Sequence, residues 1–98
     1  PEQEARLRKL IRSGRLAIGP WYVLPDEFLV SGESIIRNLQ LGHAIAARFG
    51  GVTAVGYLPD QFGHISQMAQ ILRGFGIADA VVWRGVGADV TRAEFVWQ

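Results

Sequence analysis

The sequence contains no cysteine, and this absence sets the first limits on its chemistry. Disulfide bonds and thiolate metal sites are excluded, so any metal ion must be held by oxygen or imidazole ligands. No apolar run reaches the ~18 residues of a membrane-spanning helix, and the first residues lack the basic-then-apolar order of a signal peptide. We therefore expect no membrane partner and a cytoplasmic location.

The sequence also lacks an excess of charge of either sign. Ten lysine and arginine residues stand against nine aspartate and glutamate residues, which leaves a net charge of +1. This balance does not provide the basic surface that attracts phosphate backbones, so nucleic acid is not expected as a partner.

The 98 residues, 49% of them hydrophobic, are enough for one small core. We therefore expect residues 1–98 to form a single folded unit. The chain begins at Pro1 without a methionine and stops inside an apolar run, Phe95 to Trp97. This pattern favours a fragment of a longer protein.

Hydrophobic periodicity predicts helices that alternate with apolar strands. Helices are expected at residues 1–12, 35–49 and 65–75, the second and third of them ending on glycine. Continuous apolar runs predict strands at residues 16–19, 52–57 and 80–83. This order favours the α/β class, with parallel strands joined by crossover helices.

In such a fold, the loops that follow the strands meet at one face, where ligands bind. These loops cover residues 20–32, 58–64 and 84–92. They carry aromatic rings, carboxylates and an arginine: Trp21, Tyr22, Asp26, Glu27, Asp60, Gln61, Phe62, His64 and Arg84. Aromatic faces beside planar polar groups suit a polyhydroxylated ring, although other ligands would fit the same set.

The spacing of Asp60 and His64 leaves two interpretations open. Residues four apart can place a carboxylate and an imidazole on one metal ion. An aspartate that follows proline and precedes a helix is, however, more often an N-cap, and a lone histidine there is more often structural. Spacing alone favours the structural interpretation, and it does so more strongly for His43 on the middle helix. Gly85 and Gly87 lack the strand, glycine loop and helix order of a nucleotide site.

Three stretches of the sequence carry a recognisable pattern. They are Gly19–Glu27, Gly56–His64 with the following Gln67-Met68 and Ile71–Ile77, and Val82–Gly85. In order and spacing they resemble the bacterial α-mannosidases of glycoside hydrolase family 38. The resemblance implies a fragment of the N-terminal catalytic domain, a seven-stranded (β/α) barrel.

The resemblance also implies roles for particular residues. In that family the aspartate of the Asp-x-Phe-Gly-His motif is both a zinc ligand and the nucleophile, which gives Asp60 both roles. Phe62 and Arg84 match positions lining the sugar subsite, and Trp21 and Asp26 lie in a loop near the same pocket. His64 receives no ligand role, because the family's other ligands lie before and after this segment.

The implied activity is retaining hydrolysis of α-mannosides with Zn²⁺, and the acid/base and three zinc ligands lie outside the chain. The Tyr-Leu-Pro-Asp form of the motif resembles members that act on small mannosides such as mannosylglycerate. The alternative is an inert folding or interaction module. Its exposed strand edges would pair with the remainder of the barrel or with a second copy.

Overall fold

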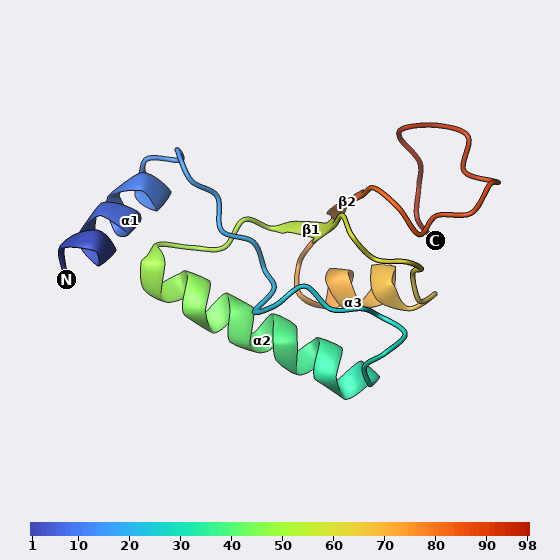
Figure 1. The fold of residues 1–98 in the computed structure, drawn as a ribbon, viewed down its shortest axis with the longest axis horizontal. Coiled ribbons are helices and arrows are strands. Elements are labelled where there is room, and N and C mark those ends of the chain that lie inside the picture. Colours follow the sequence, from blue (N-terminus) through green and yellow to red (C-terminus); the bar gives the residue numbers. More distant parts are fainter.

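Three helices and two short strands make up the fold in a computed structural model that describes residues 1–98 (Figure 1). In chain order they are α1 (Glu2–Arg12), α2 (Gly32–Phe49), β1 (Val55–Leu58), α3 (Met68–Gly74) and β2 (Asp79–Val82). The molecule is elongated, measuring 48 × 29 × 21 Å, and α1 lies at one end of it.

The long helix α2 has the boundaries that its sequence dictates. The Ser31 side chain accepts a hydrogen bond from the Ser34 N–H and so caps the first turn. The helix ends at Phe49 and is followed by the C-cap Gly50, whose φ of 128° few other residues adopt. No helix of the chain, α2 included, combines the length and the apolarity needed to cross a membrane.

The two strands are parallel, as the sequence predicts, and α3 forms the crossover between them. The register pairs Val55 with Asp79 at one end and Leu58 with Val82 at the other. Both α2 and α3 lie on the same side of this strand pair (Figure 1). A buried cluster joins the two helices to β1, made of Ile35, Leu39, Leu58, Met68, Leu72 and Ile77.

The predicted strand at residues 16–19 is wrong. This segment lies beside the residues that precede β1, but only the Ile18 carbonyl is bonded there, accepting from the Thr53 N–H at 2.8 Å. A ladder needs repeated bonds, and Pro20 has no N–H to continue one. The third helix is also shorter than expected, because it begins at Met68 and not at Ile65.

Candidate functional site

The parallel register brings Asp60 and Arg84 together. Leu58 and Val82 are the last paired residues of β1 and β2. Asp60 lies two residues after Leu58, and Arg84 lies two residues after Val82. Because parallel strands end at the same edge of a sheet, both side chains emerge there. Asp60 Oδ1 lies 3.3 Å from Arg84 Nε, and these side chains are 68% and 41% exposed.

Two aromatic rings lie against the same guanidinium. The Arg84 Cζ atom is 4.5 Å from the centre of the Trp83 ring and 5.5 Å from that of Phe62. Both rings are largely exposed. The edge of the sheet therefore presents a carboxylate, a fork of N–H donors and two open aromatic faces, which is a set of groups suited to a sugar ring.

The backbone at Asp60 is hydrogen-bonded to the side chain of Gln61, which is buried. Gln61 Oε1 accepts a hydrogen bond from the Asp60 N–H at 3.1 Å. Its Nε2 donates to the Pro25 carbonyl at 2.8 Å, so the loop after α1 is tied to the loop that carries Asp60. A buried amide with both ends bonded restricts how far Asp60 can move.

A second tie joins all three loops through Glu27 and His64. Glu27 Oε1 lies 2.8 Å from His64 Nδ1, and Oε2 accepts from the Ile65 N–H at 2.8 Å. His64 Nε2 lies 2.9 Å from the carbonyl oxygen of Arg84. The Glu27 side chain is fully buried and that of His64 is 7% exposed.

Gly85 allows the last loop to pack closely against the Asp60 loop. Its φ of 78° is in the left-handed region. A Cβ atom at this position would lie 2.6 Å from the Gln61 carbonyl oxygen and 2.7 Å from the Gly63 nitrogen. Only glycine fits without displacing backbone.

The structure brings together three of the residues singled out from the sequence: Asp60, Phe62 and Arg84. The Trp21 indole N–H instead donates to the Tyr57 carbonyl at 3.1 Å, with the ring packed against the core. Asp26 is half-buried, and its carbonyl accepts from the Leu29 N–H.

The N-cap interpretation of Asp60 is wrong, because α3 begins at Met68 and its N-cap is Gln67. His43 is placed structurally, with Nδ1 2.8 Å from the Leu39 carbonyl oxygen and its ring 5.3 Å from that of Phe75. His64 does not reach towards a metal shared with Asp60, because both of its ring nitrogens already have partners.

The contacts that Glu27, His64 and Gln61 make between loops are not predictable from the sequence. All three residues lie in the loops predicted to converge, but a buried hydrogen bond between distant residues leaves no periodic pattern in the sequence. The one usable signal was composition: a glutamate and a histidine in loops predicted to converge. The spacing of His64 from Asp60 suggested the wrong partner.

A family model confirms the likeness seen in the motifs. The description "Glycosyl hydrolases family 38 N-terminal domain" matches residues 1–98, which is the whole chain. The chain belongs to glycosyl hydrolase family 38.

Relatives of this family 38 chain are found in bacteria and in animals. It is 49% identical to the "Putative mannosylglycerate hydrolase" of Halalkalibacterium halodurans, over 88% of this chain and 10% of that protein. It is 35% identical to Alpha-mannosidase 2C1 of Mus musculus, over 79% of this chain and 8% of that protein. The chain thus spans about a tenth of the length of the curated relatives it matches.

A solved structure has the same fold. The crystal structure of an alpha-mannosidase from Enterococcus faecalis V583 matches with a TM-score of 0.83 and 38% sequence identity. The match covers 88% of this chain and 10% of that one. At this identity the likeness extends beyond fold to a related sequence.

The donor atoms of this family 38 chain fit a partial metal site at most. No group of three or more histidine or acidic side chains is arranged to hold a metal ion. Apart from its ion pair with Arg84, the Asp60 carboxylate accepts no hydrogen bond, so it has lone pairs to offer. Carboxylate oxygen is an accepted zinc ligand, and Asp60 can therefore supply one ligand among several.

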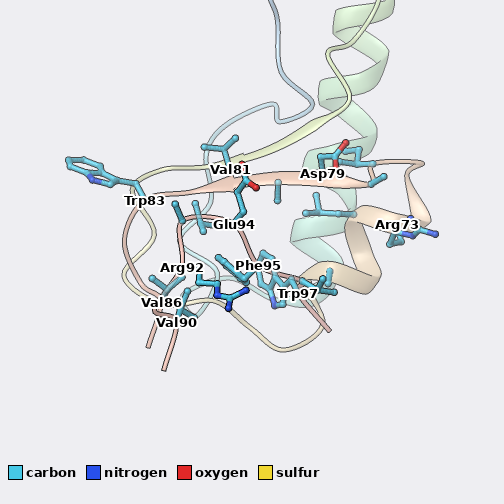
Figure 2. A pocket seen from close by; sticks show the side chains of 18 residues that line it. Arg73, Asp79, Val81, Trp83, Val86, Val90, Arg92, Glu94, Phe95 and Trp97 are labelled. Carbon is cyan, nitrogen blue, oxygen red and sulfur yellow. The ribbon is translucent and has the colours of Figure 1, made fainter. Parts of the chain in front are cut away.

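A large hollow in this family 38 chain lies away from Asp60. It has a volume of about 870 Å³ and lies between β2 and the C-terminal segment, lined mostly by apolar side chains. Figure 2 shows Phe95 and Trp97 of that segment beneath the strand, while Trp83 extends away from them. Asp60, Phe62 and Arg84 do not line it, so we assign the candidate site to the sheet edge and not to this hollow.

Proposed function

We propose that this chain supplies the nucleophile segment of a zinc-dependent, retaining α-mannosidase. The observation that carries the proposal is the position of Asp60 at the carboxyl edge of the parallel strands, facing Arg84 at 3.3 Å. Family membership supports mannoside hydrolysis as the reaction. The motif around Asp60 supports the choice of this residue as the catalytic carboxylate.

The surrounding groups would bind the sugar. The exposed ring of Phe62 offers a face for the C–H groups of a mannose ring, and Arg84 offers N–H donors to its hydroxyls. Trp21 and Asp26 are proposed as further substrate contacts from the preceding loop. Because the Trp21 N–H is bonded to Tyr57, its contribution would come from the ring face.

In the proposed reaction the Asp60 carboxylate attacks the anomeric carbon as the bond to the leaving oxygen breaks. The leaving oxygen takes its proton from an acid elsewhere in the full-length protein. Water then cleaves the glycosyl ester of Asp60 and releases mannose with its configuration retained. Glu27 cannot be this acid, because it is buried and both its oxygens are bonded to protein groups.

Asp60 would also be one of the zinc ligands. When bound, the zinc ion would supply a Lewis acid for the hydroxyls of the sugar. We further propose that β1 and β2 belong to a seven-stranded (β/α) barrel, whose remaining strands pair with their outer edges. The relative named as a mannosylglycerate hydrolase supports a small mannoside as the substrate.

The test is Asp60→Asn in the full-length protein. The amide keeps the shape of the side chain but removes the charge that attacks carbon and weakens the ligand. We expect hydrolysis of mannosylglycerate and of an aryl α-mannoside to fall by several orders of magnitude, with thermal unfolding little changed.

Asp79→Asn is the matched control, because Asp79 is an exposed aspartate at the opposite, amino end of β2. It should leave the rate unchanged. If Asp60→Asn retains more than about a tenth of wild-type turnover, a loss of under roughly 1.4 kcal/mol, Asp60 is not the nucleophile.

A further inference from the structure

We propose that Glu27 and His64 form a positioning pair that fixes the Arg84 backbone and thereby sets the guanidinium against Asp60. The proposal rests on the function proposed above for Asp60 and Arg84, and it adds two residues that touch neither the sugar nor the metal. The observation behind it is a chain of hydrogen bonds that begins in one loop, passes through a second and ends on Arg84 itself.

The donors and acceptors in this chain leave little freedom. The Arg84 carbonyl can only accept, so His64 Nε2 must carry a proton and donate it. The contact between His64 Nδ1 and Glu27 Oε1 then needs one further proton, whichever of the two atoms holds it. The second oxygen of Glu27 accepts from the Ile65 N–H, so both oxygens are bonded to protein groups.

Burial makes these bonds costly to lose. The Glu27 side chain is fully buried, that of His64 is 7% exposed, and neither has an unpaired polar atom. The Trp97 ring meets the His64 ring edge-on at 5.3 Å, so the C-terminal segment covers the pair as well. A buried polar group without its partner is strongly disfavoured, which holds the Arg84 carbonyl at its distance from His64.

The hydrogen bond from His64 to the Arg84 backbone also restrains the Arg84 side chain at the site. His64 holds the carbonyl of the same residue whose Nε faces Asp60 at 3.3 Å. That ion pair is exposed and therefore too weak to fix its own geometry. The Trp83 and Phe62 rings flank the guanidinium, and its position relative to Asp60 also depends on the Arg84 backbone, whose carbonyl His64 holds.

The test compares two amides at position 64 in the full-length protein. The amide nitrogen of glutamine can occupy the place of imidazole Nε2, so His64→Gln keeps the bond to Arg84 and loses the one to Glu27. The shorter asparagine places its nitrogen near Nδ1, so His64→Asn keeps Glu27 and loses Arg84. Both variants remove the ring and leave a buried amide, which matches them for general effects on folding.

We expect His64→Asn to lower kcat/KM for the α-mannoside by about 10- to 100-fold, the cost of misplacing a binding group by about 1 Å. His64→Gln should stay within about threefold of the wild type, because its bond to Arg84 remains. Equal losses in the two variants, in proportion to their loss of thermal stability, would show a purely structural role and overturn the proposal.

A double-mutant cycle with Arg84→Met isolates the path through Arg84. If His64 acts through the guanidinium, adding His64→Asn to Arg84→Met should lower kcat/KM by less than about a further threefold. Full additivity of the two losses contradicts the proposal. Zinc content is measured for each variant, and a loss confined to His64 variants would show a ligand role instead.

Glu27→Gln serves where a position 64 variant does not fold. Its amide oxygen can accept from Ile65 and its nitrogen can donate to a neutral His64, so every bond in the chain survives without charge. Activity within about threefold of the wild type supports positioning, and a folded variant as weak as Arg84→Met refutes it.

Crystal structures of His64→Asn and His64→Gln separate this proposal from the proposed function. Arg84 should leave Asp60 only in His64→Asn, whether or not the protein cleaves mannosides. An inactive wild type would refute the function alone, and an unmoved Arg84 in His64→Asn would refute the pair alone.

Discussion

Gly85→Ala is the change that most directly tests whether the two site loops must pack backbone against backbone. Alanine adds one carbon atom, at a position where it would lie 2.6 Å from the Gln61 carbonyl oxygen and 2.7 Å from the Gly63 nitrogen. Both contacts are with backbone, so no side chain can rotate to make room. The loop of Arg84 and the loop of Asp60 must move apart.

Two costs add in this variant. A left-handed φ of 78° costs a non-glycine residue about 1–2 kcal/mol. Forcing a methyl group into a packed contact costs about 1–3 kcal/mol more. The domain should therefore lose about 2–5 kcal/mol of stability. If the loops part by about 1 Å, activity should fall about 100-fold even in the folded protein.

Gly87→Ala is the matched control in the same loop. Its new Cβ would meet only the Asp89 carboxylate, which can rotate away, and Gly87 does not have a positive φ. Thermal unfolding and hydrolysis of an aryl α-mannoside are measured for both variants of the full-length protein. Gly87→Ala should resemble the wild type in both measurements. A Gly85→Ala variant that does the same would refute the close packing of the two loops.

Three further predictions concern groups that support the site. Asn38→Ala removes an amide that accepts from the Tyr22 and Val23 N–H groups and donates to the Val23 carbonyl, and should cost about 1–3 kcal/mol in chemical unfolding. Gln61→Leu keeps the size of the side chain but removes the acceptor of the Asp60 N–H, so kcat should fall about 10-fold. The control Gln40→Leu, at an exposed position, should leave kcat unchanged. Leu39→Ala opens a cavity in the core and should lower stability by about 2–5 kcal/mol, with the rate per folded molecule preserved.

Much of the fold was predictable because it depends on local patterns. The glycine after α2 and the apolar spacing of α1 and α2 mark helices that form from nearby residues. The parallel pairing of β1 and β2 was also predictable, since a helix between two short apolar runs leaves few other arrangements. Residues 16–19 could not be decided locally, because an apolar run becomes a strand only where a partner offers a ladder.

The candidate site was predictable in outline and not in detail. Asp60 and Arg84 were placed on one face because each follows a strand, and the structure brings them to 3.3 Å. The tie from Glu27 to His64 depends on how three loops pack, which no spacing in the sequence encodes. The family resemblance implies a metal-ligand role for Asp60 and none for His64, whereas residue spacing alone allowed the two to act as a pair.

The ties behind the site also bear on how the chain folds. The bonds that hold Gln61, His64 and Ile65 to the loop before α2 join residues 36 to 38 positions apart, and the bond to Arg84 spans 20. Helices form from neighbours within about a microsecond, whereas contacts of this separation wait for larger loops to close. In refolding, the helical signal should return first. In the full-length protein, the recovery of hydrolysis would then report that these loops, and not only the helices, have reached the native arrangement.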